Sequence, residues 1–155
     1  MATIPHSVSD FLGQRRLAVA GVSRDPTQAA NAVYRKLRDS GFEVFPINPK
    51  ASEVEGVRCY PGLESVPGPI GGVVIATHPG ASIEVVRQCA ALGVGRVWLH
   101  RSFGEGSVSA EAVRECEARG IRCIVGGCPL MYCPPIDLGH RCMRWLLRWQ
   151  GRVPG

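Results

Sequence analysis

Small and polar residues follow a predicted apolar strand in a pattern that suits phosphate binding. The strand is expected to run from Leu17 to Gly21, and a helix is predicted over residues 28–40. The turn between them reads Gly21-Val22-Ser23-Arg24-Asp25-Pro26. A helix that begins directly after such a turn offers free N–H groups and the positive end of its dipole to an anion. This turn is therefore our first candidate ligand site.

The next predicted strand, over residues 42–47, ends in Asn48, Pro49 and Lys50. Proteins that bind NAD usually place a carboxylate here, where it bonds the hydroxyls of the ribose. This chain has a cation instead. The pattern therefore favours a nucleotide whose ribose carries a phosphate, and it disfavours an NAD-dependent dehydrogenase.

A parallel sheet is needed to bring these turns together. An amphipathic helix, a glycine and a β-rich run recur three times, with the glycines at Gly41, Gly93 and Gly120. Each glycine suits the left-handed position that ends a helix. The alternation predicts a single α/β domain over residues 1–155, a Rossmann-like, doubly wound parallel sheet of about five strands with flanking helices.

The expected elements can be given by residue number. Strands are predicted over 17–21, 42–47, 72–76, 96–100 and 121–125, and helices include 9–15, 28–40 and 137–149. A short extended piece is expected around 57–60. Ligands of such sheets bind outside the carboxyl ends of the strands, where the strand order reverses. The later turns at that edge add these candidate contacts: Thr77, His78, His100, Arg101, Ser102 and Cys128.

The chain also carries a series of short phrases in a characteristic order. They are Gly21–Pro26, Asn31, Tyr34, Val44–Pro49, Gly56, Cys59-Tyr60-Pro61, Trp98 and Cys128-Pro129. In this order they resemble the small stand-alone CoA-binding domains, a family similar to the N-terminal domain of the succinyl-CoA synthetase alpha subunit. The resemblance covers about residues 8–129. The chain departs from the family pattern at Thr77–Gly80 and at His100–Ser102. It also departs in the many Cys, Trp and Arg residues of 128–149.

The resemblance implies a protein that binds coenzyme A or acyl-CoA. The pyrophosphate would lie at Ser23–Pro26, the adenosine end at Asn48–Lys50, and the pantetheine arm near His100–Ser102. NADP or another nucleotide stays an alternative, because a 2′-phosphate and a 3′-phosphate make similar demands on Lys50. The length of 155 residues leaves no room for the further domains of a ligase or dehydrogenase. We therefore expect a non-catalytic protein with a regulatory or carrier role.

Seven cysteines, an odd number, argue against a secreted disulfide framework and for a cytoplasmic location. A catalytic thiol would have to be Cys128 or Cys133, with His78, His100 or His140 as its base, and we expect no such catalysis. Cys128 is expected nearest to the thiol of CoA. A mixed disulfide there would make the protein a redox sensor, which is a further alternative.

A zinc site is conceivable from Cys128-x4-Cys133-x6-His140-x-Cys142, but this is not the usual paired spacing, and we expect no metal. The net charge of +5 comes almost entirely from scattered arginines, which indicates solvated helix faces and not nucleic-acid binding. No run approaches the ~20 apolar residues of a membrane span.

The predicted C-terminal helix, 137–149, has an apolar side. Its members are Leu138, Cys142, Trp145, Leu146 and Trp149. Two interpretations stay open for this side. It either docks on the core of the domain or forms the interface of a homodimer, for which two tryptophans would be a large anchor.

Overall fold

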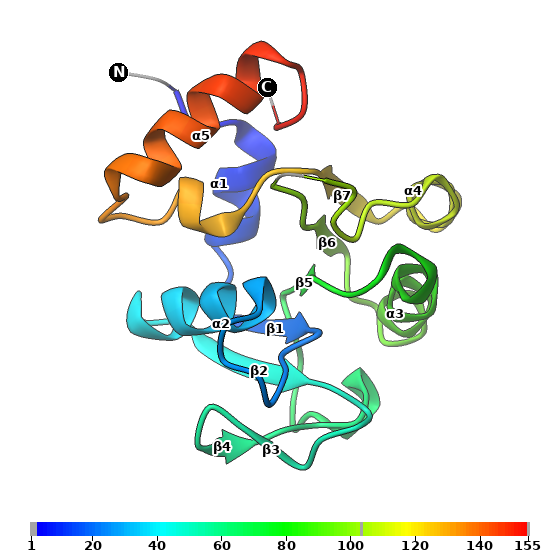
Figure 1. Ribbon diagram of the computed structural model, residues 1–155. Coiled ribbons are helices and arrows are strands. Elements are labelled where there is room, and N and C mark those ends of the chain that lie inside the picture. The colour runs from blue at the N-terminus through cyan, green and yellow to red at the C-terminus, as the bar shows by residue number, and fades with distance from the viewer. Residues whose placement is uncertain (1–2, 103, 155) are drawn as a thin grey trace.

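The computed structural model describes residues 3–102 and 104–154. A five-stranded sheet lies at its centre (Figure 1), with the strand order β2-β1-β5-β6-β7. The strands are β1 (Arg16–Ala20), β2 (Glu43–Ile47), β5 (Gly72–Ile75), β6 (Arg96–Leu99) and β7 (Arg122–Val125). All neighbouring strands of this sheet are parallel. The predicted Rossmann-like α/β fold is therefore confirmed.

Helices cover both faces of the sheet. Five α-helices occur in the described part of the chain: α1 (His6–Leu12), α2 (Ala29–Asp39), α3 (Pro79–Ala91), α4 (Ala110–Ala118) and α5 (Leu138–Trp149). Figure 1 shows α3 and α4 together on one side, with α1, α2 and α5 on the other. None of these helices combines the length and the apolar character that a membrane crossing requires.

The alternation of side chains along the strands explains the two layers. In β1, Leu17 and Val19 belong to one buried cluster, whereas Ala18 and Ala20 belong to the other. Successive side chains of a strand point to opposite faces, so a strand buried on both faces reads as a continuous apolar run. Each face therefore has a core of its own, and the sheet is held rigidly between them.

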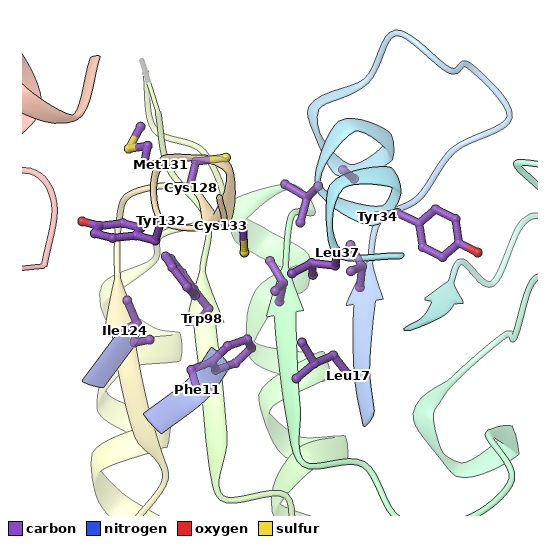
Figure 2. Close-up of a cluster of buried hydrophobic side chains, with 14 of the residues drawn as sticks. Phe11, Leu17, Tyr34, Leu37, Trp98, Ile124, Cys128, Met131, Tyr132 and Cys133 are labelled. Carbon is purple, nitrogen blue, oxygen red and sulfur yellow. The ribbon is translucent and has the colours of Figure 1, made fainter. Parts of the chain in front are cut away.

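Phe11, Tyr34, Trp98 and Tyr132 lie in the core on the side of α1, α2 and the segment after β7 (Figure 2). Trp98 is fully buried there, and its ring meets that of Phe11 edge-on, with 5.5 Å between the centroids. Its indole Nε1–H donates to the carbonyl of Gly126 at 3.0 Å. The tryptophan thus ties β6 to the loop that follows β7.

Two expectations about local structure need correction. The first helix ends at Leu12, not at residue 15, because β1 already pairs with β2 at Arg16. The region 51–70 contains a hairpin of β3 (Glu53–Val54) and β4 (Val57–Arg58), followed by the 3-10 turn η1 (Leu63–Ser65). Glu55 and Gly56 form the tip of the hairpin with positive φ angles of 52° and 74°.

Candidate functional site

The strand order reverses between β1 and β5, so the loops after these strands diverge at the carboxyl edge of the sheet. Gly21 directly follows β1 at this point and has a φ of 102°. A Cβ atom on Gly21 would lie 2.4 Å from the carbonyl oxygen of Ala76 and 3.3 Å from Cγ2 of Thr77. Only glycine therefore fits where the backbones of the two loops meet.

The loop after Gly21 is organised by its own side chains. Asp25 accepts hydrogen bonds from the backbone N–H of Thr27 at 2.9 Å, from its hydroxyl at 2.7 Å and from Nε2 of Gln28 at 2.9 Å. The bonds from Gln28 and Thr27 lower the pKa of the Asp25 carboxyl to about 2. A carboxylate so held would repel a phosphate. The structure thus gives Asp25 the place of a loop organiser, whereas the sequence suggested a ligand contact.

Gln28 is the N-cap residue of α2, and no side chain of the residues that the structure describes caps its first turn. Helix termini without such partners leave backbone N–H groups free for an anion. Arg24 lies exposed on the same loop, next to Ser23. The start of α2 therefore retains the donors and a cation that a pyrophosphate requires.

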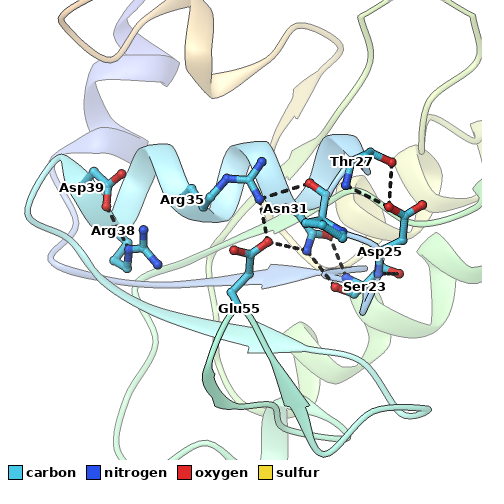
Figure 3. Close-up of polar contacts among 9 residues, drawn as sticks. Ser23, Asp25, Thr27, Asn31, Arg35, Arg38, Asp39 and Glu55 are labelled. Carbon is cyan, nitrogen blue, oxygen red and sulfur yellow. Dashed lines mark hydrogen bonds and ion pairs between the residues drawn. The ribbon is translucent and has the colours of Figure 1, made fainter.

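A polar network that was not predicted from the sequence fixes this loop from behind (Figure 3). Asn31 is 1% exposed; its Oδ1 accepts the backbone N–H of Ser23 at 2.9 Å, and its Nδ2 donates to the Ser23 carbonyl at 2.7 Å. The same Nδ2 donates to Glu55 at 2.7 Å. Arg35 donates to Glu55 at 2.6 Å and to the carbonyl of Pro26 at 3.1 Å. Both ends of the loop are thus fastened to α2.

A signal for this network was present in the sequence. Asparagine is a poor residue for a helix interior, because its amide competes for backbone hydrogen bonds. A buried Asn31 in α2 therefore needs a polar partner outside the helix. Its partner Glu55 comes from the hairpin tip 24 residues later, a distance that no local pattern reveals.

Replacing Asn31 with alanine is expected to lower the free energy of unfolding by about 1–3 kcal/mol, because the half-buried backbone of Ser23 loses both hydrogen bonds to Asn31 and Glu55 loses one of its two donors. CoA affinity should fall as well, since the loop is no longer held in place. Urea denaturation and calorimetric titration measure the two effects. Thr27→Ala, which removes one exposed hydroxyl from the same loop, serves as the control and should change stability far less. Equal losses in both variants would contradict a special role for Asn31.

Asn48 and Lys50 lie beside the loop, at the end of β2. The Asn48 amide donates to the carbonyl of Val22 at 2.9 Å and accepts the backbone N–H of Lys50, also at 2.9 Å. Asn48 therefore joins the two turns, and Pro49 follows it on the surface. Lys50 is exposed and makes no ion pair with any residue that the structure describes. Its ammonium group is free to meet a ligand.

On the other side of Gly21, Thr77 lies at the end of β5 and His78 is the N-cap residue of α3. The Thr77 hydroxyl lies 3.2 Å from the carbonyl of His78 and 3.4 Å from the hydroxyl of Ser82. His78 is exposed and provides no side-chain cap. The structure thus brings Gly21, Ser23, Asn48 and Thr77 together at one edge.

His100 directly follows β6 and is 6% exposed. Its backbone is held from both sides, since its N–H donates to Ile75 at 2.9 Å and its carbonyl accepts the N–H of Ser107 at 2.8 Å. Burial lowers the pKa of the imidazole to about 4. The ring is therefore neutral at physiological pH.

This shift predicts a pH-dependent stability. Between the folded pKa of about 4 and the unfolded value of 6.5, the unfolded chain binds more protons than the folded chain. The contribution of His100 to the free energy of unfolding is therefore fully present above pH 6.5. It is lost as the pH drops toward 4, and the loss is roughly 3 kcal/mol for a shift of this size. Urea denaturation of the His100→Asn variant should show a flatter profile in this window, whereas His78→Asn should keep the wild-type slope.

Arg101 turns away from the phosphate loop. Its backbone forms an isolated bridge with Gly127, and its Nη2 lies 3.5 Å from the carbonyl of Arg152. Its Nε is buried without a partner among the described residues. The guanidinium thus lies between the loop after β7 and the C-terminal segment, and the pantetheine contact of Arg101 and Ser102 stays a prediction.

Cys128 lies within the core and not on the surface of the edge. It is 4% exposed and belongs to the cluster of Met131, Tyr132 and Cys133 (Figure 2). Burial raises the pKa of its thiol to about 12, although the Leu130 backbone and the neighbouring Ser102 hydroxyl oppose the shift slightly. Cys128 therefore offers no accessible thiolate for the expected contact with the CoA thiol. The redox sensor that depends on this contact lacks the same group.

The other cysteines are free thiols as well, and Cys142 is the exposed one. No group of three or more possible metal ligands occurs among the described residues. The spaced Cys128–Cys142 pattern does not converge, because Cys128 and Cys133 are buried in the core whereas Cys142 lies on the outside of α5.

Comparison with known proteins identifies the family. A family model described as a CoA binding domain matches residues 15–134. The chain belongs to this CoA-binding domain family. The resemblance seen in the sequence is thereby confirmed, and the match contains all the turns at the Gly21 edge.

The relatives of this CoA-binding domain include ligases and small proteins. Acetate–CoA ligase [ADP-forming] II from Archaeoglobus fulgidus is 30% identical over 116 residues, which cover 72% of this chain and 17% of the ligase. The alpha subunit of the Pyrococcus furiosus acetate–CoA ligase II is 31% identical over 97 residues, or 61% of this chain and 21% of the subunit. The chain thus spans about a fifth of the length of these relatives.

A protein of similar size from Bacillus subtilis, the uncharacterised YneT, is 28% identical over 118 residues. These residues cover 82% of YneT. Among solved structures, a hypothetical protein from Pyrococcus horikoshii has a TM-score of 0.72 and 27% identity. The alignment covers 83% of this chain and 92% of that one. The chain is therefore similar both to parts of ligases and to proteins close to it in length.

Proposed function

We propose that this protein binds coenzyme A, free or as acyl-CoA, at the Gly21 edge of the sheet and serves as a carrier or regulator. The observation that carries the proposal is the Ser23–Thr27 loop, which Asn31 and Arg35 hold at the uncapped start of α2 in a chain of the CoA-binding domain family. A loop held in its binding conformation loses little entropy when a ligand arrives.

In this proposal the pyrophosphate lies against the free N–H groups of α2, with Arg24 as an exposed cation on the same loop. The 3′-phosphate of the adenosine lies near Lys50, one loop further along the edge. The free ammonium group of Lys50 suits a ligand with a phosphate on its ribose. NADP also carries such a phosphate, so it is the second candidate ligand. The seven free thiols fit a reducing compartment such as the cytoplasm.

We further propose that the chain does not turn its ligand over. The two groups best suited to thioester chemistry, the Cys128 thiol and the His100 imidazole, are both buried. A nucleophilic cysteine needs an accessible thiolate, which a pKa of about 12 disfavours.

Calorimetric titration with CoA, acetyl-CoA and NADP, combined with native mass spectrometry of the purified protein, tests the proposed ligand. CoA or acetyl-CoA should bind at least tenfold more tightly than NADP. The reverse order would assign the site to NADP. Release of free thiol from acetyl-CoA tests the absence of catalysis. Release that is lost in Cys128→Ser or His100→Ala would contradict this part of the proposal.

A further inference from the structure

The last helix, α5, has two apolar sides, and only one of them packs on the protein. Leu147 is fully buried and Met143 packs beside it against the core. On the opposite side Leu138, Trp145 and Trp149 are 73%, 72% and 81% exposed. The expectation that this side docks on the core is therefore wrong. The family match ends at residue 134, so α5 lies beyond the CoA-binding domain proper.

The exposed residues of α5 follow a regular spacing. Leu138, Cys142, Trp145 and Trp149 are separated by four, three and four positions. This is the heptad spacing of the a and d positions, at which one helix packs along another. All four side chains are exposed. The four side chains therefore form one straight apolar row along α5, a shape that suits a second helix lying beside it.

The charges on α5 restrict how a second copy could pair. Within 138–149 the helix has three arginines and no acidic residue. Arg141 and Arg148, both exposed, flank the spaced residues on one side, and Leu146 flanks them on the other. An antiparallel pair would place the arginines of both copies along the same flank. A parallel pair would place the arginines of each helix on the flank of the other copy's Leu146, which avoids the repulsion.

We propose that α5 pairs in parallel with α5 of a second copy along Leu138, Cys142, Trp145 and Trp149. The docked side of α5 is opposite to this seam, so the two protein bodies lie on opposite sides of the helix pair and do not collide. A helix of 12 residues is about 18 Å long. It offers less than the ~800 Å² per partner of a standard interface, so the dimer should be weak and depend on its tryptophans.

Sedimentation of the full chain over a range of micromolar concentrations tests the dimer. The wild type should form a concentration-dependent dimer, and Trp145→Gln or Trp149→Gln should weaken it at least tenfold. These side chains are exposed in the monomer, so the variants are expected to fold, which circular dichroism checks. Leu92→Gln, which changes a 48% exposed leucine at the end of α3, is the matched control and should dimerise like the wild type.

The parallel orientation has its own test, because it places Cys142 opposite Cys142 of the other copy. Diamide should join them: one S–S bond forms, and the two thiols give two electrons and two protons to the N=N bond of diamide. Cross-linking should be slower in Trp149→Gln, which keeps Cys142 exposed, and absent in Cys142→Ser. A dimer that is not cross-linked through Cys142 would overturn the parallel arrangement.

Other occupants of the face would give other results. A chain that stays monomeric at all concentrations overturns the proposal, and binding to vesicles of phosphatidylglycerol and phosphatidylcholine would then assign the face to an anionic lipid surface. A dimer that persists in the Trp145→Gln and Trp149→Gln variants would also overturn it, since the interface would lie elsewhere.

Discussion

Replacing Gly21 with alanine is expected to abolish CoA binding and to lower the free energy of unfolding by about 2–4 kcal/mol. Two independent effects combine at this position. The φ of 102° is unfavourable for any residue with a Cβ atom, and the new Cβ would lie 2.4 Å from the carbonyl oxygen of Ala76. The contact is with backbone, which cannot rotate away. The loops after β1 and β5 would therefore have to separate at the proposed site.

Gly41→Ala provides a matched control for this prediction. Gly41 has a similar φ of 92°, but a Cβ atom there would meet nothing within 4 Å. Its cost should be only the conformational one, about 1–2 kcal/mol, with CoA affinity unchanged. Denaturation curves and calorimetric titration of both variants give the free energy of unfolding and the CoA affinity. The difference between the variants separates the cost of backbone strain from that of the steric clash with Ala76. Equal destabilisation, or CoA binding retained in Gly21→Ala, would contradict the role assigned to the Gly21–Ala76 contact.

Replacing Lys50 with glutamate is expected to reduce the affinity for CoA about 30- to 100-fold and to change that for dephospho-CoA much less. Unit charges about 4 Å apart in water interact by ~1 kcal/mol, and the glutamate replaces this attraction to the phosphate by a repulsion of similar size, a change of ~2 kcal/mol or more. Lys50 is exposed and has no ion pair among the described residues, so its loss should leave the fold intact. Titration with the two ligands at low ionic strength measures the difference.

Arg15→Glu is the control for net charge, because Arg15 is exposed at the opposite edge of the sheet, just before β1. It alters the charge of the protein by the same amount and should affect both ligands slightly and equally. If Lys50→Glu weakens CoA and dephospho-CoA to the same degree, then Lys50 does not contact the 3′-phosphate. A loss of NADP affinity larger than that of CoA would favour the alternative ligand.

Much of the architecture was predictable because it depends on local patterns. The continuous apolar run of β5 and the glycines after the helices indicated a parallel sheet without any distant contact. The carboxyl ends of parallel strands share one edge, so the turns at Ser23, Asn48 and Thr77 could be expected near one another. The order of short phrases then identified the family, which the match over 15–134 confirmed.

The role of each side chain at that edge depended on contacts between distant segments. Asp25 and Asn48 have the polar groups of ligand contacts, but in the folded chain they organise the loops. Cys128 follows a strand end as predicted, yet the short helix η2 (Pro129–Met131) that it precedes packs against α2 and draws its thiol into the core. Burial of this kind is decided by the segments that meet in space.

The sequence by itself determined that α5 would have an apolar side, since periodicity along a helix is a local property. Only the tertiary structure decided which side the protein covers. Leu147 and Met143 fill the space above the Trp98 core, and the larger tryptophans stay outside. Similarly, Glu55 reaches Asn31 and Arg35 only because the β3–β4 hairpin folds back beside α2. A hydrophobic or hydrogen-bonding pattern shows what a residue needs, whereas the packing of the whole chain determines which neighbour meets that need.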